Sequence, residues 1–171
     1  MGDLSTGEFS TALLLFRLVF GVVFATHGLA KLKSLDGTAG WFDSMGMKPG
    51  ALHARAAAGT EIGTGAMLAA GLLTSFAAAG MVGVMLVAGW TVHRSNGFAM
   101  VNDGWEATFV FGLVAVFVAG LGPGEYSVDD ALGLADTLNG WVGVAIAAGL
   151  GLAGGVAQLA LFYRPPVTAE A

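Results

Sequence analysis

Cysteine is absent from this 171-residue sequence, and charged residues are scarce, at 11% of the chain. The lack of cysteine excludes a disulfide framework, a thiol relay and covalent haem attachment through a CxxCH motif. Basic runs are also missing and the formal net charge is −5, so nucleic-acid binding has no electrostatic basis. Apolar residues, in contrast, make up 56% of the chain, which exceeds the average for soluble domains. The composition therefore predicts an integral membrane protein.

Long uncharged stretches predict five transmembrane helices, since about 20 apolar residues cross the hydrocarbon of a bilayer. The expected ranges are 10–32, 51–73, 76–94, 105–121 and 138–163. Residues 33–50 are rich in glycine and contain a proline, so they are predicted to be a loop with a short amphipathic turn around Trp41. No internal repeat is present. We therefore expect a single all-α membrane domain over residues 1–171.

The charges outside the predicted helices separate by side. If the five helices alternate in direction, one side receives six of the seven basic residues and the other receives only acidic ones. The positive-inside rule then predicts a multi-pass protein of the plasma (inner) membrane with its N-terminus outside and its C-terminus in the cytoplasm. The basic side holds Lys31, Lys33, Lys48, Arg55, Arg94 and Arg164, and the acidic side Asp3, Glu8, Glu125, Asp129, Asp130 and Asp136.

The first predicted helix carries Arg17, His27 and Lys31 within an apolar span. Burying a charge in hydrocarbon costs several kcal/mol, so such groups usually face a bundle interior and need partners. At about 100° per residue, Gly21, Phe24, Gly28 and Lys31 share a face with Arg17. This face is expected to point inward.

Glu61 is the partner that the sequence suggests for Arg17. It lies in the second predicted helix among small residues that permit close helix packing. Counting about 1.5 Å per residue along two antiparallel helices places Glu61 within about one turn of Arg17. We therefore expect an Arg17–Glu61 ion pair. Such a pair would either only join the two helices or also line a ligand pocket, and the sequence leaves both open.

Three histidines, His27, His53 and His93, belong to different predicted helices but are expected at the same ends of those helices. Imidazoles there could bind a transition metal, hydrogen-bond a quinone head group, or contact interfacial water and lipid head groups. A metal site is not favoured, because no histidine spacing within one helix is a metal motif. The predicted pocket is lined by Arg17, His27, Lys31 and Glu61, with His53 and His93 nearby.

Three segments resemble a known family. They are the first-helix pattern that ends in His27-Gly-x-x-Lys31-Leu, the Glu61-x-Gly63 region, and the Gly-Pro-Gly-x-Tyr-Ser-x-Asp stretch from Gly122 to Asp129. In this order, over residues 13–132, they resemble the DoxX family of small four-helix membrane proteins. The resemblance implies a four-helix bundle, here with an additional fifth helix. It also implies a membrane subunit linked to redox systems, since the family's namesake is associated with a thiosulfate:quinone oxidoreductase.

The functional prediction is a membrane subunit or anchor of a quinone-linked oxidoreductase complex, with quinone as its ligand and a soluble redox enzyme as its partner. Catalytic residues and an enzymatic activity are not assigned. Two alternatives stay open, a non-catalytic membrane scaffold or assembly protein and a small-solute transporter. The glycine-rich last helix, with Gly151 and Gly155 in a GxxxG pattern, is expected to lie outside the core and to form a homo-oligomer contact.

Overall fold

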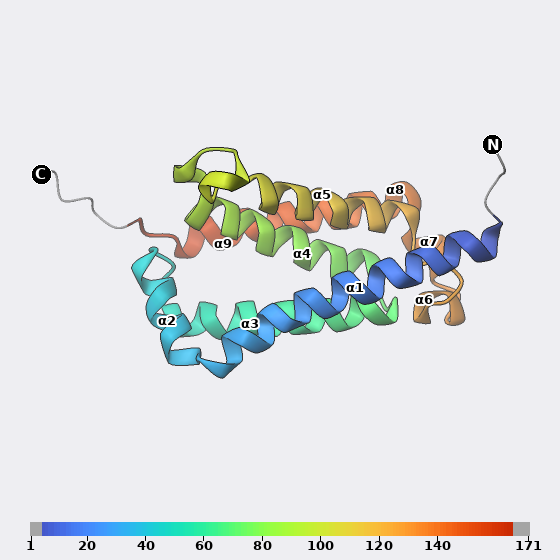
Figure 1. Cartoon of the computed structure of the whole chain (residues 1–171), viewed down its shortest axis with the longest axis horizontal. Helices are drawn as coiled ribbons and strands as arrows, with labels where there is room; N and C mark the ends of the chain where they lie inside the picture. Colours follow the sequence, from blue (N-terminus) through green and yellow to red (C-terminus); the bar gives the residue numbers. More distant parts are fainter. Residues whose placement is uncertain (1–4, 166–171) are drawn as a thin grey trace, which may run out of the picture.

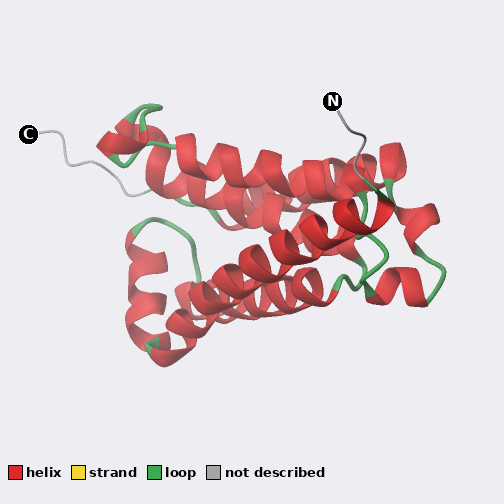
Figure 2. Ribbon diagram, turned by 45° about the vertical axis from the view of Figure 1, so that its right-hand side comes forward, coloured by secondary structure: helices red, strands yellow, loops and turns green. Residues whose placement is uncertain are grey.

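The computed structural model describes residues 5–165, and these form an all-α bundle (Figures 1 and 2). Five antiparallel runs make up its body: α1 (Thr6–Lys33), α3 (Gly50–Ala70), α4 (Thr74–Ala88), α5 (Glu106–Leu121), and α8 (Gly140–Val144) continued into α9 (Gly151–Phe162). Two π-helical segments extend them, η1 (Gly89–His93) after α4 and η4 (Ala145–Leu150) before α9. The remaining elements are α2 (Leu35–Ser44), η2 (Arg94–Asn96), η3 (Met100–Asn102), α6 (Val128–Ala131) and α7 (Ala135–Leu138).

Each range that the sequence predicts to be a helix is helical in the structure, but the prediction of a loop over residues 33–50 is wrong. Residues 35–44 form the ten-residue helix α2. Gly37 and Gly40 do not break this helix, because Phe42 is buried against Met47, Ala54 and Val87 and so anchors the segment. Burial against other elements therefore outweighs the local preference for a loop.

Three helical runs are long and apolar enough to cross a bilayer, and they span Thr6–Lys33, Thr74–Asn96 and Gly140–Phe162. The apolar helix α5 is shorter, and α3 carries charged residues along its 21-residue length. The described part of the chain ends on opposite sides, with the start of α1 at one end of the bundle and the end of α9 at the other (Figure 1). The protein is therefore a membrane protein whose apolar helices contact the lipid bilayer.

Helices α1 and α3 pack tightly along one side of the bundle. The face of α1 predicted to point inward is buried, and it includes Arg17, Gly21, Phe24 and Gly28. A Cβ atom on Gly21 would clash with the carbonyl of Gly65, and one on Gly65 would clash with the carbonyl of Gly21. The two backbones approach each other as closely as small residues allow in membrane helices.

Helix α4 is the centre of the other side, where it packs against α5 and α9. Gly151 and Gly155 are buried against α4, and a Cβ atom on Gly151 would clash with Val82 and Ala79. The prediction that these glycines lie outside the core is wrong, because α4 of the same chain covers them. Self-association of the protein stays a prediction. The fifth helical run is part of the core.

The two sides of the bundle separate toward the end where α2 lies (Figure 1). Two strand-like hydrogen bonds bridge them there, since the Lys48 amide donates to the Phe162 carbonyl at 3.2 Å and the Arg164 amide donates to the Gly46 carbonyl at 2.7 Å. The space between the two sides, with α1 and α3 on one and α4, α5 and α9 on the other, is therefore wedge-shaped. Helix α2 and the end of α9 close the wide end of this wedge.

Candidate functional site

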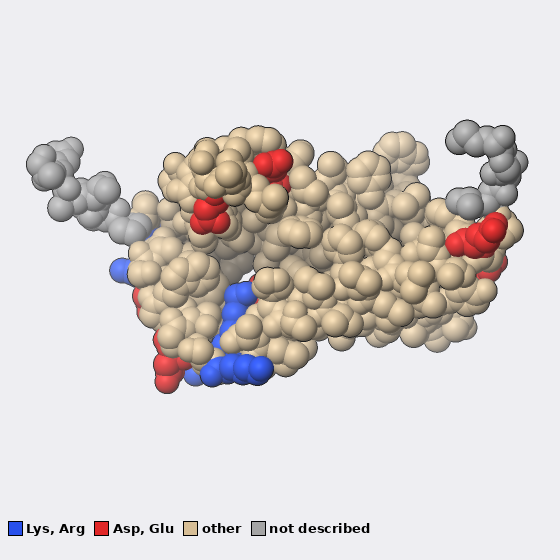
Figure 3. Space-filling model, viewed as in Figure 1, with Lys and Arg blue, Asp and Glu red and all other residues tan. Residues whose placement is uncertain are grey.

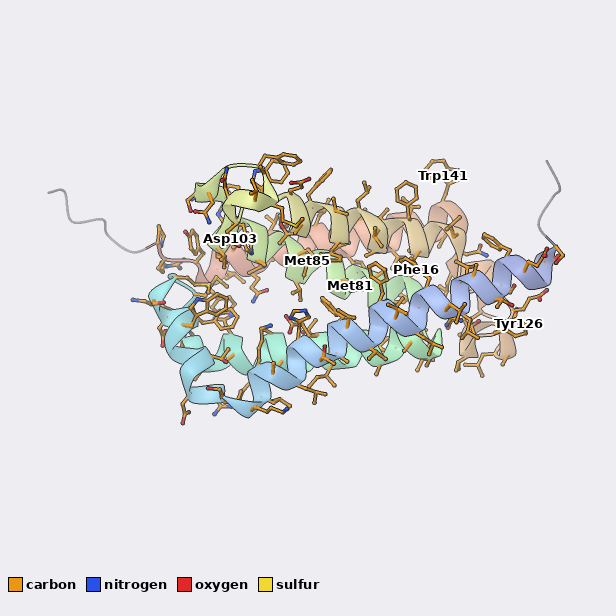
Figure 4. The ribbon with its side chains drawn as sticks, in the orientation of Figure 1. Phe16, Met81, Met85, Asp103, Tyr126 and Trp141 are labelled. Carbon is orange, nitrogen blue, oxygen red and sulfur yellow. The ribbon has the colours of Figure 1, made fainter. Side chains whose placement is uncertain are left out.

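The wedge contains a cavity of about 640 Å³, to which α1, α2, α3, α4, α5 and α9 all contribute. Its lining is mainly apolar, and Figure 4 shows Met81 and Met85 of α4 in the space between α4 and α1. The face of the molecule seen in Figure 3 is hollowed between the two sides of the bundle, and basic side-chain atoms border the hollow. Size and lining are those of a pocket for a small organic molecule.

Lys31 and Glu61 form an ion pair on the cavity wall. The Lys31 Nζ atom donates to both carboxylate oxygens of Glu61, at 2.8 Å to Oε1 and 2.7 Å to Oε2. The Glu61 side chain is 5% exposed and that of Lys31 is 22% exposed. The pair satisfies the Glu61 carboxylate and uses two of the three ammonium N–H groups of Lys31.

The predicted Arg17–Glu61 pair is wrong, because the register of the two helices separates these residues. Gly28 of α1 lies against Ala58 of α3, and Gly21 lies against Gly65, so Arg17 lies near Gly71 at the end of α3. Gly71 and Glu61 are ten residues apart, which corresponds to about 15 Å along a helix, so Arg17 and Glu61 are too far apart to pair. Of the predicted pocket residues, Arg17 alone lies at the opposite end of the bundle from the cavity.

The histidines occupy three different environments. His27 and His93 line the cavity, from α1 and η1 respectively, whereas His53 is buried behind its wall. His53 Nδ1 lies 3.1 Å from the side-chain amide of Gln158, which does line the cavity. His93 Nδ1 lies 2.9 Å from the carbonyl of Asp103. Within residues 5–165, no three histidine or acidic side chains gather in a way that could hold a metal ion.

Gln158 and three threonines are cavity residues that the sequence reasoning missed. Thr60, Thr91 and Thr108 bring hydroxyl groups to the lining from α3, η1 and α5. The hydroxyls of Thr91 and Thr108 donate to carbonyls of their own helices, at 2.8 Å each, so their outward lone pairs remain as acceptors. Gln158 had a visible signal, since it is the only glutamine in the chain and lies within an apolar span.

Both π-helical segments border the cavity. Thr91 and His93 of η1 face it, and Leu150 closes η4 beside it. A π-helical turn inserts an extra residue into a helix and often occurs at functional sites, because it re-aims side chains at a cost in regular hydrogen bonding. His93, the last residue of η1, is on the cavity lining.

The segment that carries most of this lining matches the model of a known family. The family model for DoxX matches residues 12–94, which run from α1 into η2 and include Lys31, Glu61 and His93. Residues 12–94 therefore form a DoxX domain. The match ends before Gly122–Asp129, so the resemblance of that stretch stays a prediction. Neither the curated proteins nor the solved structures contain a match to the chain.

Arg17 lies within the DoxX segment but serves a different place in the molecule. It is fully buried, and its Nη2 atom donates to the carbonyl of Tyr126 at 2.6 Å. Gly71, with φ of 65°, ends α3 beside it, and a Cβ atom there would clash with the guanidinium. Arg17 therefore attaches the stretch after α5 to the DoxX segment at the end opposite the cavity.

Proposed function

We propose that this DoxX-family protein is a membrane subunit or anchor of a quinone-linked oxidoreductase complex, and that its cavity binds the quinone head group. The observation that carries the proposal is the Lys31–Glu61 ion pair in a mainly apolar cavity inside a membrane protein. Ionisable groups at membrane depth are costly and usually mark a ligand or proton pathway. A ligand that arrives from the bilayer fits a cavity between lipid-embedded helices.

The lining suits the two carbonyl oxygens of a quinone. The third N–H group of Lys31 is a donor for one of them, and the His27 ring, which makes no hydrogen bond with any residue from 5 to 165, is a donor for the other. Phe20 and Phe111, whose ring centroids are 6.1 Å apart, provide aromatic surface from α1 and α5. A bound quinone would supply two-electron, two-proton chemistry, and a soluble partner enzyme would exchange the electrons.

The proposal includes a topology. In a single membrane domain in which α3 and α5 also cross the bilayer, there are five crossings, and six of the seven basic residues lie toward the wide end of the wedge. The positive-inside rule then favours a cytoplasmic wide end, with the N-terminus outside. The cavity would lie in the cytoplasmic half of the membrane, within reach of a soluble redox enzyme.

Tryptophan fluorescence offers a direct test, because Trp41 lines the cavity and Trp141 is 87% exposed and remote from it. A variant that keeps only Trp41, with the other three tryptophans replaced by phenylalanine, is titrated in detergent with a short-chain ubiquinone or menaquinone. Saturable quenching of Trp41 fluorescence is expected, and His27→Ala or Lys31→Met should weaken the apparent affinity. The matched control keeps only Trp141 and should show only the weak, non-saturable quenching of collisions.

Two results would argue against this function. Equal, non-saturable quenching in both single-tryptophan proteins would show that the cavity does not bind the quinone. Absence of extractable quinone and of any co-purifying redox enzyme from native membranes would favour the scaffold alternative, in which the ion pair only joins α1 to α3.

A further inference from the structure

A second concave surface lies on the outside of the bundle, between α4, α5 and the η4–α9 run. This outer groove has a volume of about 490 Å³ and a lining that is almost wholly apolar. Met85 and Thr108 line both the outer groove and the cavity, so they form the partition between the two. Phe109 and Leu113 on its rim are 53% and 44% exposed, so the groove faces the lipid rather than the bundle interior.

Arg94 is the one charged residue among those that line the outer groove. Its guanidinium lies over the ring of Trp90, with the Cζ atom 4.2 Å from the ring centroid. Among residues 5–165 no carboxylate lies within ion-pair distance of Arg94, and its side chain donates no hydrogen bond to any of them. The stacked, planar donor group is thus held in place while its N–H groups remain for an external anion.

The dimensions of the groove match one leaflet of a bilayer. From Val82 to Arg94 the lining spans about twelve helical residues, or about 18 Å, and half of a typical 30 Å hydrocarbon core is about 15 Å. Trp90 and Trp105 lie at the Arg94 end, where aromatic residues are usual at the level of lipid head groups. The charged end of the groove is therefore at the membrane interface, and the apolar remainder runs toward the middle of the bilayer.

We propose that the outer groove is a binding site for an anionic phospholipid, with the phosphate at Arg94 and one acyl chain along α4 and α5. Charge complementarity selects an anionic lipid, because a guanidinium binds phosphate oxygens through two parallel hydrogen bonds. The long apolar lining selects a lipid over a free phosphate, which would make no use of it. This site is separate from the quinone cavity and does not depend on its function.

Native mass spectrometry of the full-length protein tests this site. The detergent-solubilised protein is offered phosphatidylglycerol or phosphatidylcholine with the same dioleoyl chains, and the bound lipids are counted. A preference for phosphatidylglycerol is expected, and Arg94→Gln should reduce that preference about tenfold, as the loss of one charge-assisted contact predicts. The matched control is Arg55→Gln, because Arg55 is also exposed but donates to its own helix at the Ala51 carbonyl.

A second variant tests the acyl-chain part of the site without touching the charge. A Cβ atom on Gly112 would meet only Met85 Cβ, at 3.7 Å, so Gly112→Leu should fold and fill the outer groove. It should lower the binding of both lipids, whereas Gly63→Leu, at a site with open space on α3, should not. An equal preference in wild type and Arg94→Gln would overturn the proposal. Equally strong binding of glycerol phosphate, which lacks acyl chains, would also overturn it.

Discussion

Arg17 donates a hydrogen bond to the backbone carbonyl of Tyr126, 109 residues later in the chain, at 2.6 Å. Figure 4 shows Tyr126 at the end of the bundle near the start of α1, far from the cavity. Three residues on, the buried carboxylate of Asp129 accepts hydrogen bonds from the amides of Leu73 and Thr74, at 2.6 and 2.9 Å. The stretch after α5 therefore accepts a hydrogen bond from Arg17 of α1 and caps the start of α4. These contacts join the two sides of the bundle at the narrow end of the wedge.

Asp129→Ala should destabilise the protein by about 1–2 kcal/mol or more, because it removes the side-chain acceptor for the first amides of α4 and for the Thr74 hydroxyl. The neighbouring Asp130→Ala is the control. Because Asp130 is exposed, this substitution should change the free energy of unfolding by less than about 0.5 kcal/mol. Thermal unfolding in detergent, followed by circular dichroism, measures both. Equal unfolding temperatures would contradict the capping role.

Lys31→Met should lower the stability of the protein by up to about 3 kcal/mol, because it leaves the nearly buried Glu61 carboxylate without its partner. The double variant Lys31→Met with Glu61→Leu should recover much of this loss, since both charges are then removed. Lys33→Met, which alters an exposed lysine two residues later in α1, is the control. Losses that simply add in the double variant would show that the two residues are not coupled.

Gly21→Ala should severely disturb the packing of α1 on α3, because the added Cβ atom would clash with backbone atoms of Gly65 and Ala69. Gly63→Ala on α3 is the matched control, since its added Cβ atom has no neighbour within 4 Å. Alanine is also the better helix former, so the control should unfold at the same temperature or higher. A well-folded Gly21→Ala protein with an unchanged unfolding temperature would mean that α1 and α3 are not in close backbone contact at Gly21.

Gly151→Leu should destabilise the folded chain itself, because the new side chain would enter the contact between α9 and α4 at Val82 and Ala79. Gly149→Leu, in the adjoining π-helical segment with no atom within 4 Å of an added Cβ, should be tolerated. Size-exclusion chromatography with light scattering distinguishes loss of the folded chain from a change in its oligomeric state. A well-folded Gly151→Leu protein that differs from wild type only in oligomeric state would instead support an intermolecular contact at this glycine.

The cavity lining contains some of the residues that the sequence singles out and omits others, while a ligand-binding role for any of them stays a prediction. His27, Lys31, Glu61 and His93 were predicted as pocket residues, and all four line the cavity, because ionisable groups in apolar helices stand out from their neighbours. Arg17 stands out in the same way but lies elsewhere, since its depth depends on which residue of α3 it faces. Gln158 stands out as a polar residue in an apolar span, and the threonines are ordinary polar residues, but only the approach of α9 and α5 to α1 and α3 brings them to the same cavity.

The sequence by itself determined the membrane class, the ranges of the long helical segments and the inward face of α1. These properties depend on apolar runs and on helical periodicity, both of which act over a few turns of a single segment. The tertiary structure decided the partner of Glu61, the burial of Gly151 and Gly155 against α4, and the helix at residues 35–44. Each of these depends on the register between segments distant in the chain, where a shift of a few residues changes which atoms touch and no local pattern records it.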